Sequence, residues 1–237
     1  MKIVEVSEIV ASAGPAELLA EDSAAPHMAI AAHPVWRSVF AGDLPKPALV
    51  ELVSHFYPVV AGPGRYAFIA KIGVIDRDDG TRLFQRLHRV THDEAFDADS
   101  GWKRMAEAVG AEPGRLSALL EAPSAEAADL IDVVRRHGEQ ASPAEAAGVA
   151  WVLERQMPGW MGGLADALAR HYGVPDDALA YLRTEAAEAG EAEAWVAHLM
   201  DRYFMSADPY NVFEARRAMR EAGWAWTALT EQATRLA

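Results

Sequence analysis

One carboxylate stands apart in this 237-residue sequence. Glu154 lies within the run from Trp151 to Met161, where aliphatic residues, a proline and aromatic rings predominate. A carboxylate buried among apolar neighbours costs free energy unless another group pairs with it, binds it or protonates it. Such residues are candidates for acid–base chemistry. We expect Glu154 to be enclosed and catalytic and Met161 to line its pocket, the alternative being a solvated helix stripe.

Three ring-bearing residues near the N-terminal third are further candidates. His33 stands just before Pro34 near a helix start, where an imidazole could act as acid or base near neutral pH. The alternative is a core histidine hydrogen-bonded to a carbonyl. Tyr57 precedes a proline and Tyr66 follows shortly after, so their hydroxyl groups could line a substrate pocket. Aromatic residues at helical spacing are nevertheless more often part of a core.

A pair of histidines offers one metal-binding pattern. His88 and His92 are four residues apart, so they share a helix face, and Glu94 follows within the same two turns. This spacing can hold a metal ion. Charged residues alternate with the histidines, so an exposed, charged side of the helix is an equally good interpretation.

A late acidic stripe offers a second pattern. Its members recur at helical spacing: Thr184, Glu188, Glu191, Trp195 and His198. Carboxylates one turn apart can share a proton or hold a hard cation, and Trp195 would line the same pocket. Glu185 and Glu193 occupy neighbouring faces, so the whole segment could instead be a solvated acidic flank.

The elements that position these residues are predicted to be helices throughout. Alanine is abundant, strand-like alternation is missing, and proline or glycine recurs at helix-length intervals. We expect a break or kink at Pro58 and a single all-α domain over 1–237, with 1–24 as a peripheral extension. The predicted helices cover about 26–40, 45–64, 79–96, 101–109, 124–136, 142–172, 174–204 and 208 onward.

Composition narrows the class of function. The net charge is −13 and no basic patch is present, which argues against nucleic acid and an anionic membrane surface as partners. No apolar run is long enough for a membrane span, and no secretory signal is evident. Cysteine is absent, which excludes disulfides, thiolate metal sites and a cysteine nucleophile. We expect a cytoplasmic protein that acts on a small molecule.

The order of several short motifs resembles the haem-oxygenase-like superfamily. The branch it resembles contains thiaminase II, pyrroloquinoline-quinone synthase and the non-haem di-iron oxidases. This resemblance implies a helical bundle with an internal pocket into which Glu154 points, with His33 as a pocket residue. The motifs are His33-Pro34, Phe40-Ala-Gly-Asp-Leu44, Phe56-Tyr57, Glu154 with Pro158, His171-Tyr-Gly173, Tyr181-Leu-Arg183 and the tryptophans of the last helix.

The resemblance also implies a ligand set, from which this sequence departs. Glu94 and Glu154 match the two glutamates of the di-iron oxidases, but Gly101 stands where a histidine ligand is expected. Glu188 and Glu191 have the spacing of the late ligands without their histidines. Iron in oxygen-activating sites usually relies on imidazole as well as carboxylate. Non-haem iron would therefore need a carboxylate-rich set: Glu94, Glu154, Glu188 and Glu191, helped by His92.

The resemblance leads to one principal expectation and two alternatives. The principal one is a dioxygen-dependent oxidoreductase of small-molecule biosynthesis, with Glu154 and His33 as acid–base or anchoring groups. The first alternative is a thiaminase II-like hydrolase that uses a glutamate in place of cysteine, with Glu188 or Glu191 as its acid. The second is a non-catalytic binding or partner protein of the same fold. A homodimer is compatible with each.

Overall fold

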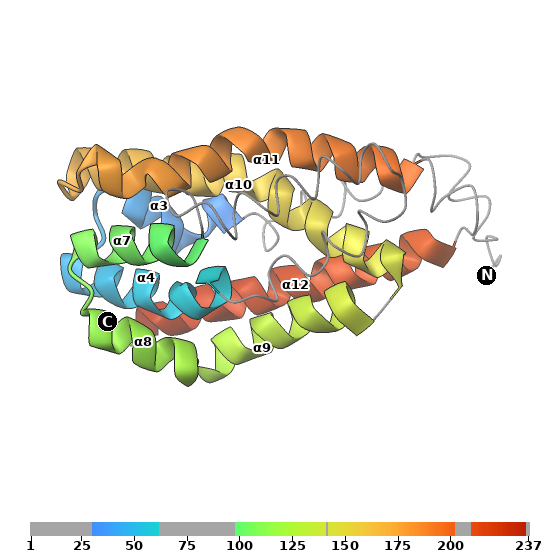
Figure 1. The fold of residues 1–237 in the computed structure, drawn as a ribbon, viewed down its shortest axis with the longest axis horizontal. Helices are drawn as coiled ribbons and strands as arrows, with labels where there is room; N and C mark the ends of the chain where they lie inside the picture. The colour runs from blue at the N-terminus through green and yellow to red at the C-terminus, as the bar shows by residue number, and fades with distance from the viewer. Residues whose placement is uncertain (1–29, 62–97, 141, 202–209, 236–237) are drawn as a thin grey trace.

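The prediction of an all-α fold is confirmed. The computed structural model describes residues 30–61, 98–140, 142–201 and 210–235, and no strand occurs in these ranges. Long helices run roughly along one common direction (Figure 1). In chain order the elements are η2 (Ile30–Ala32), α3 (Pro34–Ala41), α4 (Lys46–Ala61), α7 (Ala98–Val109), α8 (Pro113–Glu121), α9 (Ala125–Arg135), the π-helical η4 (Arg136–Gln140), α10 (Pro143–His171), η5 (Asp176–Leu179), α11 (Ala180–Leu199) and α12 (Tyr210–Arg235).

Most described helices begin where the sequence predicts. Ser142 caps α10 through a capping box with Glu145, and Ser124 caps α9 by accepting the amide of Ala127. The sequence predicts a kink or a break at Pro58, and α4 does not break there, because it continues through Pro58 to Ala61. The expected helix over 79–96, the second bend at 62–64 and the extension over 1–24 lie outside the described residues.

One helix was not predicted. Pro113 and Gly110 indicate a stop after α7, but Pro113 also opens α8, as its place at the first helical position allows. Leu116 on α8 is buried, and Arg115 pairs with Glu51 of α4. Packing against α4 thus stabilises a short helix that has no side-chain cap.

The central helix is α10, which contacts α11, α12 and α3. Gly148 lets it approach α12, because a Cβ there would lie 2.8 Å from the Cα of Ala215. Farther along, Trp160 of α10 packs edge-on against Trp226 of α12, with ring centroids 4.8 Å apart. Gly148 precedes Trp160 in α10, and their partners Ala215 and Trp226 follow the same order in α12. The two helices therefore run parallel.

Aromatic rings fill the space between α3, α4, α10 and α12. Trp36 and Phe56 each pack against Trp160, at centroid distances of 5.2 and 5.7 Å, and Phe56 also packs against Trp226. Trp102 adds α7 to the cluster and donates a hydrogen bond to the carbonyl of Val53. Edge-to-face contacts of this kind add stability beyond area burial. This part of the bundle is a packed core.

A buried polar network ties the start of α10 to α12. Glu145 is 5% exposed, accepts a hydrogen bond from Arg217, and belongs to the capping box. His137 in η4 is 3% exposed, and its Nε2 lies 2.9 Å from Glu221. The network therefore joins η4 and α10 to α12 by pairing the buried side chains of Glu145 and His137 with the more exposed Arg217 and Glu221.

Replacing Glu145 with alanine is expected to lower the free energy of unfolding by roughly 3 kcal/mol. The change removes a helix cap and the carboxylate that Arg217 and the nearby imidazole of His137 share. Urea denaturation followed by far-UV circular dichroism measures the loss. Glu107→Ala on the exposed side of α7 is the control. A loss no larger than that of the control would show that the network contributes little.

A second buried histidine makes stability depend on pH. His55 is 6% exposed, and burial lowers the pKa of its imidazole; Glu51 opposes this and Arg115 adds to it. The unfolded chain therefore binds a proton at His55 more readily than the folded chain. The stabilisation is fully present above the unfolded pKa of about 6.5 and is lost as pH falls below it toward the lowered folded value.

We expect the free energy of unfolding to drop between about pH 7.5 and about pH 5.5, and to drop less in His55→Gln. Denaturant titrations at the two pH values measure the difference. His171→Gln, which changes an exposed histidine, should keep the wild-type dependence. An unchanged pH dependence in His55→Gln would contradict the assignment.

Candidate functional site

The predicted enclosure of Glu154 is confirmed. Its side chain is 3% exposed, although its neighbour Arg155 is exposed and pairs with Glu193 of α11 at 2.8 Å. On α10, Glu154 shares a stripe with Met157 and Met161, at spacings of three and seven residues, and both are fully enclosed. A carboxylate therefore lies on an inward, otherwise apolar face, where its charge is sensitive to whatever binds beside it.

A second carboxylate on α11 is as deeply buried. Glu185 is 1% exposed and lies on the stripe of Tyr181 and Ala189, which are also buried. The sequence leaves open whether Glu185 belongs to a solvated acidic flank, and the structure shows that Glu185 is buried. The missed signal is the spacing, because Glu185 stands four residues after Tyr181 and four before Ala189.

The register of α10 and α11 sets how far apart the two carboxylates lie. Gly162 faces Ala186, and Arg155 pairs with Glu193, so the helices run antiparallel. Glu185 of α11 therefore lies at the same height as Gly163 of α10, which is nine residues after Glu154. That separation is about 13 Å along the helix axis. At this separation the two side chains do not form a direct pair.

Tyr57 supplies a hydroxyl near the Glu185 end. It is 3% exposed and donates a hydrogen bond to Asp99 in the first turn of α7. Two residues farther on, Gly101 lies directly against the Tyr181 ring of α11, so this end of α7 is close to the buried stripe of α11. Tyr57 is thus buried, its hydroxyl is oriented by a carboxylate, and its role in lining a substrate pocket stays a prediction.

His33 lies at the start of α3. It is the N-cap of this helix, where its Nδ1 accepts a hydrogen bond from the Val35 amide at 3.3 Å. Burial lowers the pKa of His33, with Glu231 of α12 opposing the effect. Three residues earlier, the Ile30 amide donates a hydrogen bond to the side chain of Gln156 at 2.6 Å, so this segment lies against α10. A catalytic role for His33 stays a prediction.

The other candidates divide between the interior and the surface. Met161 is enclosed, whereas Trp195 is partly buried against the core at about the level of Glu154. Glu188 is half-buried and Glu191 is exposed, so Glu191 is outside the enclosed region. Four further candidates lie outside the described residues: Tyr66, His88, His92 and Glu94.

The described residues do not fit the iron-binding set that the resemblance implies. No group of three or more His, Asp or Glu side chains in the described ranges could hold a metal ion. Glu154 and Glu191 come from opposite environments, one buried and one exposed. We therefore derive no chemical step through iron.

None of the helices in the described ranges is both long and apolar enough to cross a bilayer.

Comparisons with known proteins agree with this architecture. No protein-family model matches the sequence, and no curated protein sequence matches it. Among solved structures, a TenA homologue from Pseudomonas syringae pv. tomato DC3000 aligns with a TM-score of 0.73 and 15% identity over 99% of this chain and 98% of that one. A TenA homologue from P. horikoshii OT3 aligns with a TM-score of 0.69 and 13% identity, over 93% and 98%.

A third similar structure is described as having a haem-oxygenase-like fold. It is a domain of unknown function with a haem-oxygenase-like fold from Shewanella denitrificans OS217, with a TM-score of 0.66 and 10% identity over 99% of this chain and 94% of that one. At these identities the similarity concerns the fold, and it extends over nearly the whole chain. The chain therefore has the haem-oxygenase-like helical fold, which it shares with the TenA homologues.

Proposed function

We propose that this protein is an enzyme that hydrolyses a carbon–nitrogen bond in a small nitrogen-containing compound, in the manner of thiaminase II but with glutamate in place of cysteine. The observation that carries the proposal is the burial of Glu154 at 3% exposure on an inward face of α10. The similarity in fold to TenA homologues supports it.

One enclosed carboxylate is enough for both proton transfers of such a hydrolysis. Glu154 would take a proton from water as the water oxygen attacks carbon, and the protonated carboxyl group would then give that proton to the departing nitrogen as the carbon–nitrogen bond breaks. Glu185 is 1% exposed but lies about 13 Å from Glu154 along the helix axis, too far to act on the same bond. Glu185 would instead accept a hydrogen bond from the far end of the substrate.

The enclosed surroundings suit such chemistry. Met157 and Met161 flank Glu154 on α10 and exclude bulk water from that side. In a region of low polarity, a fixed carboxylate stabilises developing positive charge more strongly than it does in water. A compact, flat and partly apolar substrate would fit this lining.

The experiment supplies thiamine and its aminopyrimidine fragments under nitrogen and follows product formation by liquid chromatography. The proposal requires turnover that does not depend on oxygen. Absence of turnover for every one of these compounds, with folded protein, would overturn the hydrolytic assignment for this substrate class.

Dioxygen-dependent oxidation of a small substrate is the second candidate. The burial of Glu154 favours this reaction. An enclosed carboxylate can remove a carbon-bound proton and leave an electron-rich substrate that dioxygen oxidises. Oxygen consumption upon adding a substrate, measured with an oxygen electrode, separates it from hydrolysis. A substrate turned over equally with and without oxygen would exclude it.

A further inference from the structure

His137 is a buried imidazole that lies between carboxylates of two different helices. Its Nε2 atom is 2.9 Å from Glu221 of α12, and its Nδ1 atom is 3.6 Å from Glu145 of α10. The ring belongs to η4, a π-helical turn that continues α9 directly. Turns of this kind are rare and are frequently found at functional positions.

The contact with Glu221 determines which ring nitrogen carries the proton of a neutral His137. An ionised carboxylate only accepts hydrogen bonds, so Nε2 must be the N–H group that donates to Glu221. The neutral ring then has a lone pair on Nδ1, and this atom makes no hydrogen bond within the described part of the chain. Its neighbour at 3.6 Å is the Oε1 atom of Glu145, which is also an acceptor. Two acceptors therefore lie close together in a buried region with no proton between them.

A second proton on the ring would complete this contact. A charge-assisted N–H···O bond is about 2.8 Å long, so closing the gap of 3.6 Å needs a movement of less than about 1 Å. The protonated ring of His137 would then hold both Glu145 and Glu221. The neutral ring holds Glu221 alone.

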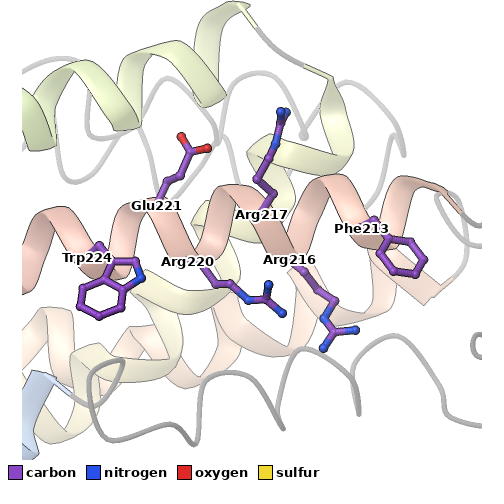
Figure 2. Close-up of a pocket in the computed structure, with 6 residues that line it drawn as sticks. All are labelled: Phe213, Arg216, Arg217, Arg220, Glu221 and Trp224. Carbon is purple, nitrogen blue, oxygen red and sulfur yellow. The ribbon is translucent and has the colours of Figure 1, made fainter.

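Each of these two carboxylates is shared with an arginine. Glu145 accepts a hydrogen bond from Arg217 of α12, and Glu221 pairs with Arg136 of η4 at 3.1 Å. Figure 2 shows Arg217 and Glu221 extending from the same side of α12. These two carboxylates and two guanidinium groups balance each other in charge.

Glu214 of α12 adds one more negative charge. Its carboxylate accepts a hydrogen bond at 2.9 Å from the hydroxyl of Ser142, the residue that forms the capping box with Glu145. With a neutral ring, the set therefore has three carboxylates and two guanidinium groups. A protonated imidazole of His137 would cancel the remaining negative charge.

Other charged side chains of α9 and α12 lie outside this set. Arg135 of α9 pairs with Asp132 of the same helix on the exposed surface. Figure 2 shows Arg216 and Arg220 extending from the opposite side of α12. The charges that act on the ring at short range are thus those of the network itself.

We propose that His137 is a proton-operated latch. A proton on its ring joins η4 and the start of α10 to α12, and loss of that proton releases Glu145 from the ring. The latch acts on the helix that carries Glu154, but the proposal does not depend on the reaction proposed there.

The test is a double-mutant cycle on the unfolding equilibrium, made from His137→Gln and Glu145→Gln and measured by urea denaturation at about pH 5.5 and about pH 8.5. An imidazole changes its charge between these values. Glutamine at position 145 still suits the capping box, so the cycle isolates the contact with the ring. We expect a coupling about tenfold larger at the lower pH, as one charge-assisted hydrogen bond provides. His55 is intact in every variant, so its own pH dependence cancels from the coupling.

Two control cycles make this result specific. The cycle of His137→Gln with Glu221→Gln should show coupling at both pH values, because the neutral ring already donates to Glu221. The cycle of Arg135→Gln with Asp132→Asn, an exposed ion pair, should show a small coupling that is the same at both. A coupling between His137 and Glu145 that is equal at the two pH values, or absent at both, would overturn the latch.

Hydrogen exchange tests the latch in the wild-type protein, without any substitution. After correction for the chemical exchange rate, the amides of η4 and of the second turn of α10 should be protected about tenfold more at about pH 5.5 than at about pH 8.5. His137→Gln should lose this difference. Equal protection of the wild-type amides at the two pH values would also contradict the proposal.

Discussion

Replacing Glu154 with glutamine is expected to lower the turnover number by about 100-fold or more. The amide keeps the size of the side chain but cannot exchange a proton near neutral pH, and general acid–base catalysis contributes about 10²- to 10⁴-fold. The side chain is 3% exposed, so water is poorly placed to substitute for it. The measurement is the initial rate on a thiamine-related pyrimidine under nitrogen, with the Michaelis constant determined alongside.

Two further variants make this result specific. Glu154→Asp keeps the carboxylate on a shorter side chain and should lose less activity than the glutamine variant. Glu107→Gln, on the exposed side of α7, should retain the wild-type rate. Circular dichroism confirms folding in each case. A folded Glu154→Gln protein that turns over substrate at the wild-type rate would overturn the proposed role.

Replacing Gly148 with alanine is expected to lower the free energy of unfolding by about 3 kcal/mol, or the melting temperature by roughly 10 °C. The new methyl group would lie 2.8 Å from the Cα and the carbonyl carbon of Ala215, and nearer still to its oxygen. Because the obstruction is backbone of α12, a rotamer change cannot relieve it. The two parallel helices would have to move apart along their whole contact. Thermal denaturation followed by circular dichroism measures the change.

Gly190→Ala is the matched control for this prediction. Gly190 lies inside α11 and is exposed, and an added Cβ there would meet no atom within 4 Å. Alanine favours the helix over glycine by about 1 kcal/mol, so this variant should be slightly more stable than the wild type. Equal melting temperatures for the two variants would show that the contact between α10 and α12 tolerates added volume.

Local sequence signals were sufficient for most of the helical framework. Ser142 with Pro143 and Glu145 marks the start of α10, and Ser124 marks the start of α9, because caps act within one turn of the chain. Pro58 predicts a kink or a break, and the break does not occur. Its ring disfavours the helix interior, but α4 is buried on most of its residues there, and that packing outweighs the local cost.

The candidate site also contains one residue that the sequence predicts and one that it does not. A glutamate in an apolar run was enough to single out Glu154, since the neighbours that enclose one side are on its own helix. Glu185 was missed because acidic residues surround it in sequence, and only the packing of α11 on α10 and α7 determines which of them faces inward. His33 caps α3 through its Nδ1, an interaction within two residues of the chain, and its catalytic role stays a prediction.

The amino-acid sequence by itself determined the helices, the lack of any thiol chemistry and the one carboxylate worth testing first. These depend on covalent composition and on interactions between residues a few positions apart. The tertiary structure alone decided that Glu185 is buried as deeply as Glu154 and how far apart along the helices the two carboxylates lie. Such facts depend on the register and facing of helices distant in sequence, which close contacts such as that between Gly148 and Ala215 set.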